Sequence, residues 1–294
     1  MVNCMDLQSL INQSAHLPTI PKVTQWVIAN LGSDEVTTSE IAKFLETDPV
    51  LSAKLLRLAN SAYFHVDRTV ESVDDAIRLL GFGMVRKLVL AGGISAVYDK
   101  VPGVDLHEFW TYSLHAACTG RWLARHCASN EDLVFTTGLL HGVGQLHLHR
   151  AAPAAMAALD LQLPVLHDER MVLESQALGF NFVTVSAALT QHWNFPASLV
   201  EPLWQLANQS DVSSSSTVGS LIQLSIWYAR KTLSNTPREA MLTDYPQPIG
   251  ELLGLSNGWI LNAQAQAAPV SGGRCLPCIP EMHELTGGME EMLY

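Results

Sequence analysis

Hydrophobic positions recur every three or four residues along most of the chain. This spacing places them on one face of an α-helix, whereas the chain shows no sustained alternation of the kind typical of strands and no Asn-Gly pair between two such alternating runs. The pattern predicts longer helices over residues 83–99, 106–128, 132–149, 166–178, 182–193, 197–208 and 214–232. The sequence therefore favours an all-α fold in which each helix packs on several neighbours.

Polar residues mark where the first helices begin and end. Thr37-x-x-Glu40 can form a capping box, in which the hydroxyl and the carboxylate each satisfy a backbone amide. Asp48-Pro49 opens the next helix, with proline at a tolerated first-turn position. Gly81 ends the helix whose apolar face comprises Val73, Ala76, Ile77 and Leu80.

The last quarter of the chain is less regular. Residues 213–216 are serines that separate two predicted helices and can cap the second. Residues 233–249 contain three prolines and predict a loop, followed by one or two helices over 249–266. We group residues 233–267 as a C-terminal helical extension. Residues 268–294 are rich in Gly and Pro and predict a flexible tail.

Composition and charge narrow the classes of function. No stretch reaches the roughly 18 consecutive apolar residues of a membrane helix, and the start of the chain lacks a secretory signal, so we expect a cytoplasmic protein without membrane contact. The net charge is −11, and residues 101–294 hold 8 basic against 17 acidic residues. Because nucleic-acid binding depends on Lys and Arg neutralising phosphates, nucleic acid is not an expected partner.

The five cysteines do not form a recognisable framework. Cys275 and Cys278 make one CxxC pair in the Gly- and Pro-rich tail. A tetrahedral zinc site needs a second ligand pair, and no other CxxC exists. We expect neither a metal role nor a redox role for this pair.

Seven of the 11 histidines fall between His107 and His167, which raises the question of a metal site. His115 and His141 are the pair of interest, because two antiparallel helices joined by a turn would bring them close. Two imidazoles do not make a catalytic centre, since such centres need a third ligand or bridging carboxylates. Candidate carboxylates near them in sequence are Asp132, Asp168, Glu169 and Glu174.

Longer motifs in the first half suggest a family. "LPTIPKV" at residues 17–23 is followed by "ETDPVLSAKLLRLANSAYF" and then by "SVDDAIRLLGFGMVRKLVL". This order resembles the HDOD domain family, and "TTGLLHGVGQL" and "LVEPLWQLAN" continue the resemblance downstream. It covers about residues 15–230. It implies an HD-like fold of two closely packed helical subdomains, an N-terminal one over about 15–100 and a degenerate HD-like one over about 101–230.

The resemblance also assigns positions. The family-motif residues are Asp48, Pro49, Asn60, Ser61 and Gly81. Catalytic HD relatives use a first histidine, a His-Asp pair, a late aspartate and, in some branches, further histidines. In this sequence the matching positions are His115, His141 with Gly142, a position near Ile226, Phe182 and Asn208. Two histidines therefore remain in a remnant metal or ligand pocket, while the carboxylates are gone.

The resemblance implies a regulatory role, because most family members are regulatory. We expect no catalytic residue, no cofactor and no bound metal, since glycine removes the charge, ligand and bridge of the missing aspartate together. The expected protein is a bacterial signalling scaffold or output module that binds a protein partner, with a small molecule or nucleotide as a further ligand. The alternative is a residual metal-dependent phosphohydrolase acting on a nucleotide or cyclic nucleotide through His115, His141 and an unassigned carboxylate.

Overall fold

The computed structural model describes residues 6–12, 19–30, 37–61, 64, 69–208, 216–261, 276–287 and 289. Within these ranges the regular elements are helices, with no β-strand, so the all-α prediction is confirmed. Among the same residues, no single helix is long and apolar enough to cross a membrane. Two bent helix pairs meet the length and composition criteria only when taken together.

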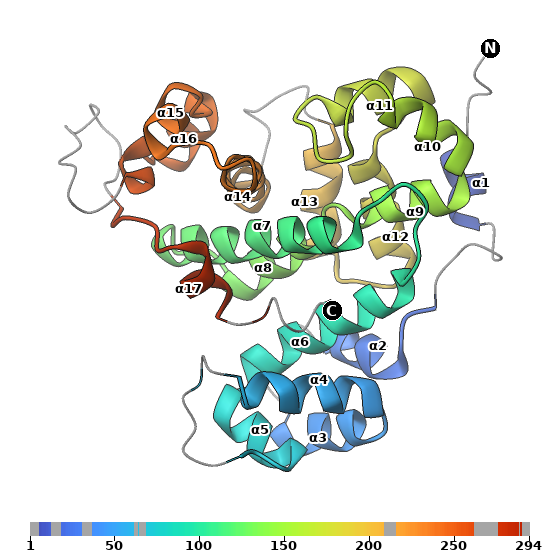
Figure 1. Ribbon diagram of the computed structural model, residues 1–294, viewed down its shortest axis with the longest axis vertical. Coiled ribbons are helices and arrows are strands. Elements are labelled where there is room, and N and C mark those ends of the chain that lie inside the picture. Colours follow the sequence, from blue (N-terminus) through green and yellow to red (C-terminus); the bar gives the residue numbers. More distant parts are fainter. Residues whose placement is uncertain are drawn as a thin grey trace.

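The first part of the chain forms a compact group at one end of the molecule (Figure 1). Its helices are α2 (Lys22–Ala29), α3 (Thr38–Glu46), α4 (Pro49–Ala59), α5 (Val73–Leu80) and α6 (Phe82–Ser95). Helix α6 packs on α2, α4 and α5, while α3 packs on α4 and α5. The preceding α1 (Leu7–Asn12) lies apart from this group, against α12.

Helix ends in this group follow the predicted chemistry. Thr37 and Glu40 form the capping box at the start of α3, and Asp48 caps α4 through the amides of residues 50 and 51. Asn60 ends α4, and its amide bonds in both directions with the backbone of Val70 at 2.7 and 2.8 Å. Gly81 ends α5 with φ 77°, a backbone conformation that glycine adopts without strain. These contacts account structurally for Asp48, Asn60 and Gly81.

The second part is built around the long helix α7 and the helices that pack on it (Figure 1). Helix α7 (Leu106–His126) packs on α8 (Glu131–Leu140) and on α14 (Thr217–Leu233). Helix α12 (Phe182–His192) packs on α9 (Val143–Ala151) and α13 (Ala197–Ala207). The predicted division near residue 100 falls between the short 3-10 helix Ala96–Tyr98 and α7.

The single helix predicted over residues 132–149 is wrong, because the chain breaks at His141 and Gly142 into α8 and α9. One side chain stabilises the break. The Ser186 hydroxyl of α12 donates to the His141 carbonyl at 2.7 Å and accepts from the Gly144 amide at 2.8 Å. A Cβ on Gly144 would lie 2.1 Å from the Phe182 carbonyl oxygen, so only glycine allows α9 to approach α12 this closely.

Periodicity also missed or misplaced shorter helices. Helix α10 (Pro153–Asp160) was not predicted, and α11 begins at Arg170 rather than at residue 166. The expected loop at 233–249 contains α15 (Arg238–Thr243) and the start of α16 (Gln247–Leu253). In both α10 and α16 a proline occupies the first turn, where it starts a helix as readily as it interrupts one.

Part of the expected flexible tail is an ordered helix. Helix α17 (Met282–Thr286) packs on α7, and Arg121 donates to the carbonyl of Leu285 at 3.2 Å. Just before it, the Ile279 amide donates to the carbonyl of Trp259 at 2.9 Å. Cys278 is a free thiol in this segment, whereas Cys275 lies outside the described residues. The apolar residues Ile279, Leu285 and Met289 are buried, which explains why the segment is held.

An ionic cluster joins the two groups of helices where α6 meets α8. Asp132 on α8 accepts from Lys87 at 2.8 Å and also pairs with Arg86. Burial raises the pKa of Asp132, but Lys87 and Arg86 outweigh it, so the net pKa lies below the usual range. The aspartate is therefore charged at neutral pH and holds two largely buried cations.

We expect Asp132→Asn to lower the free energy of unfolding by about 1–3 kcal/mol, because two largely buried cations lose their counter-charge. Urea unfolding followed by circular dichroism measures this loss. Glu131→Gln is the matched control, since the Glu131–Arg125 pair is more exposed and should contribute less than about 1 kcal/mol. Equal losses of unfolding free energy in the two variants would show that the Asp132 ion pairs do not stabilise the contact between α6 and α8.

Candidate functional site

His141 is fully buried, and both ring nitrogens have partners. Nδ1 lies 2.5 Å from the carbonyl oxygen of Gly138, and Nε2 lies 2.8 Å from the hydroxyl of Tyr112. Because a carbonyl oxygen only accepts, Nδ1 carries the proton and Nε2 presents its lone pair to the tyrosine. A metal ligand needs that lone pair, so Tyr112 competes directly with any cation for His141.

The electrostatic surroundings of His141 keep it neutral. Burial lowers the pKa of the imidazole to about 4; the bond to Gly138 opposes the shift and the charge of Arg230 adds to it. Arg230 also lies 5.7 Å from the centre of the Tyr112 ring. A positive charge therefore lies beside the tyrosine that bonds to Nε2 of His141.

The pKa of His141 predicts how stability depends on pH. The unfolded chain binds a proton near pH 6.5 and the folded chain only near pH 4, so stability falls as the pH drops through this window. Relative to His141→Asn, the wild type should lose about 1.4 kcal/mol per pH unit between these values. Urea unfolding at several pH values checks this, and parallel curves for the two proteins would contradict it.

Gly142 lies against an aromatic ring. A Cβ at this position would be 3.2 Å from two carbon atoms of the Phe109 ring, which belongs to α7 and is buried. Any side chain at this position would therefore require the ring to shift by a few tenths of an ångström. At the position that the resemblance matches to the aspartate of catalytic relatives, Phe109 thus packs closely against the backbone.

His115 is buried on α7, one helical turn after Tyr112. From the same helix, Tyr112 supplies a side-chain hydrogen bond to His141. The pair predicted from sequence is thus on adjacent, packed helices, but the described polar contact of His141 runs to the tyrosine. Ser61, another predicted position, is buried after α4 in the other helix group.

The four candidate carboxylates do not complete a metal site. Asp132 pairs with Lys87, Asp168 with Arg230 and Glu174 with Arg170, while Glu169 is exposed. Within the described part of the chain, no three His, Cys, Asp or Glu side chains come close enough to share an ion. The donor set around His141 therefore does not fit the metal of catalytic HD proteins.

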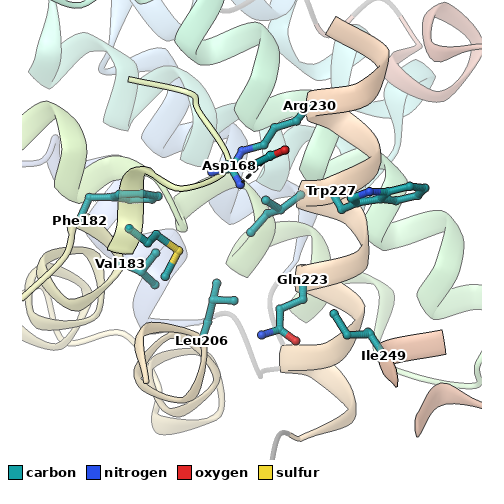
Figure 2. A pocket seen from close by; sticks show the side chains of 10 residues that line it. Asp168, Phe182, Val183, Leu206, Gln223, Trp227, Arg230 and Ile249 are labelled. Atoms are coloured by element: carbon teal, nitrogen blue, oxygen red, sulfur yellow. Dashed lines mark hydrogen bonds and ion pairs between the residues drawn. The ribbon is translucent and has the colours of Figure 1, made fainter. Parts of the chain in front are cut away.

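A cavity of about 390 Å³ lies beside this region (Figure 2). One wall is a stripe of α14 formed by Gln223, Ile226, Trp227 and Arg230. The other walls come from Asp168, Met171 of α11, Phe182 and Val183 of α12, Leu206 of α13 and Ile249 of α16. The resemblance matches three positions of this region to metal ligands of catalytic relatives. Phe182 and Ile226 line this cavity, whereas Asn208 lines a separate, neighbouring hollow.

Polar groups are confined to a few points of the cavity wall. Arg230 pairs with Asp168 at 3.4 Å at one end, and Gln223 lies two turns away along α14. The Nε of Arg230 and the Oε1 of Gln223 are buried and have no hydrogen-bond partner among the described residues. Since buried polar atoms are normally paired, these two are candidates for contact with a ligand or water.

A buried ionic network supports the rim of the cavity. Arg170 donates from Nε to Glu174 at 2.8 Å and from Nη1 to the carbonyl of Leu163 at 2.6 Å, and it pairs with Asp160 at 2.8 Å. Glu174 in turn accepts from the amide of Phe182 at 2.8 Å. The network fixes both the loop that carries Asp168 and the start of α12. Sequence periodicity gave no sign of it.

Family comparison agrees with this architecture. The family model described as "HDOD domain" matches residues 17–208, which is more than half of the chain. The chain belongs to the HDOD family. The predicted HDOD fold is therefore confirmed, although α14, which supplies Gln223, Ile226, Trp227 and Arg230, lies beyond the matched range.

Three proteins similar to this HDOD chain share between 21% and 25% of its residues in the matched ranges. A protein provisionally named a phosphohydrolase from Shewanella amazonensis has a similar structure, with a TM-score of 0.72, 25% identity and 97% of each chain covered. One provisionally named a signal transduction protein from Marinobacter aquaeolei gives a TM-score of 0.66 and 22% identity, over 88% of this chain and 63% of that one. An uncharacterised Treponema pallidum protein is 21% identical over 66% of this chain; the match spans 38% of its length.

Proposed function

We propose that this HDOD chain is a non-catalytic signal-transduction module that acts by binding. Two contacts carry the proposal. The Nε2 lone pair of His141 accepts a hydrogen bond from the Tyr112 hydroxyl, and Phe109 fills the space beside Gly142. A hydrolytic centre would need both places for a metal and its ligands. The family membership and the name of the Marinobacter neighbour support a signalling role.

The proposal includes a cytoplasmic location and a protein partner in a signalling pathway. The net charge of −11 supports a protein or small molecule, rather than nucleic acid, as what the chain binds. Affinity capture from the native host, followed by binding of the purified candidate to the purified chain, tests this. The proposal requires at least one direct partner that binds in the absence of other proteins.

The competing function is a metal-dependent phosphohydrolase, which the name of the Shewanella neighbour favours. The discriminating experiment measures hydrolysis of bis(p-nitrophenyl) phosphate and of cyclic and linear nucleotides with Mn²⁺ or Fe²⁺. We expect no rate above that of buffer, for the wild type and for His141→Asn alike. Turnover by the wild type that disappears in His141→Asn would establish the phosphohydrolase instead.

A further inference from the structure

We propose that the cavity between α14 and α12 binds a small amphipathic carboxylate. The ligand is an elongated apolar molecule with a carboxylate at one end and an N–H or O–H donor near the other. This inference deepens the proposed function and rests on it, because it treats the remnant site as a sensor that binds without turnover. It follows from the size and lining of the cavity and from two lining side chains that each carry an unpaired polar atom.

The size and lining of the cavity fit such a molecule. About 390 Å³ lies within the range of small-molecule sites. Seven of the ten side chains that line it are apolar: Met171, Phe182, Val183, Leu206, Ile226, Trp227 and Ile249. They favour an apolar body, and the few polar groups at the ends would set its orientation.

The two lining side chains that carry unpaired atoms, Arg230 and Gln223, set the ends of the ligand. Arg230 Nε is a buried donor that calls for an acceptor, and a carboxylate is the acceptor that a guanidinium binds best. Gln223 Oε1 is a buried acceptor that calls for a donor. The two residues are seven positions apart on one face of α14, which is roughly 10 Å along the helix axis. The ligand must therefore be elongated.

The same wall disfavours a phosphate group. Arg230 is the one cation among the described lining residues, and Asp168 already offsets part of its charge. The amides at the start of α12 are occupied: that of Phe182 donates to Glu174, and those of Val183 and Thr184 donate to the Asn181 side chain. A multiply charged phosphate would find neither a second cation nor a free helix N-terminus.

Isothermal titration calorimetry with 8-hydroxyoctanoate tests the inference, since its extended chain separates carboxylate and hydroxyl by about the required length. We expect saturable binding with one site, and at least about tenfold weaker binding for Arg230→Met. Lys231→Met is the matched control, because Lys231 is the next residue on α14 and pairs with Asp244 away from the cavity. It should leave the affinity unchanged.

Two further variants test the roles of the other polar groups. Asp168 is more than half exposed and competes with the ligand for Arg230, so Asp168→Asn should tighten binding by about threefold. Octanoate lacks the hydroxyl and should bind about threefold to tenfold more weakly than 8-hydroxyoctanoate. Gln223→Leu should remove that preference. These variants also keep the test informative if Arg230→Met folds poorly.

The outcomes separate this inference from the proposed function. No binding of 8-hydroxyoctanoate, equal binding by Arg230→Met and Lys231→Met, or tighter binding of AMP would overturn the carboxylate site. None of these results bears on whether the chain hydrolyses phosphoesters. Conversely, metal-dependent turnover would overturn the non-catalytic function even if the carboxylate binds.

Discussion

Arg170→Met is expected to lower the free energy of unfolding by about 3–5 kcal/mol, because it leaves the buried carboxylate of Glu174 without its counter-charge. Both side chains of this pair are completely buried. Burial raises the pKa of Glu174, and Arg170 opposes that shift. Without Arg170 the pKa of Glu174 rises further, so the variant should lose more stability as the pH increases, because the unfolded chain then releases a proton that the buried carboxyl retains.

Urea unfolding at pH 5 and pH 8 measures both effects. Arg125→Met is the control: it removes the same side chain from a double hydrogen bond to Glu131, but on the surface, so we expect a loss below about 1 kcal/mol. The double variant Arg170→Met/Glu174→Leu should recover most of the stability, because it removes both buried charges. A loss below 1 kcal/mol for Arg170→Met would show that the network does not support the rim.

Gly142→Asp should be nearly as damaging, with an expected loss of about 4 kcal/mol. The new side chain meets the Phe109 ring and adds a carboxylate in a buried position. Restoring the residue of catalytic relatives is therefore expected to harm this protein rather than to rebuild a metal site. Thermal and urea unfolding measure the loss.

Two further variants attribute the effect to Phe109. Gly142→Ala should cost about 1 kcal/mol, since its Cβ requires the ring to move by only a few tenths of an ångström. Phe109→Ala/Gly142→Asp should be less damaged than the sum of the single variants, because the first change makes room for the second. Additive losses, or a stable Gly142→Asp, would mean that Phe109 does not close the pocket.

The sequence predicted the all-α class and the caps at Thr37 and Asp48, because these depend on neighbouring residues. It did not predict the break at His141, which depends on Ser186 of α12 bonding to both sides of it. Nor did it predict α10, whose proline starts the helix. Contacts between distant segments leave little trace in local periodicity.

The candidate site shows the same limit. His141 and Gly142 could be identified from the sequence through their resemblance to a His-Asp pair, but the residues that contact them could not. Tyr112 and Phe109 are unremarkable aromatic residues of an apolar helix until α7 packs on α8. Arg230 carried a usable signal, since it is a cation at the end of the apolar run in α14. Its position beside Tyr112 still required the fold.

The central claim is that His141 has no lone pair left for a metal. Equilibrium dialysis against Mn²⁺, with metal quantified by mass spectrometry, tests it most directly, because a CxxC pair binds this ion weakly compared with zinc. We predict that wild type and His141→Asn retain equally little Mn²⁺, well below one ion per chain. One ion per wild-type chain, lost in His141→Asn, would contradict the account.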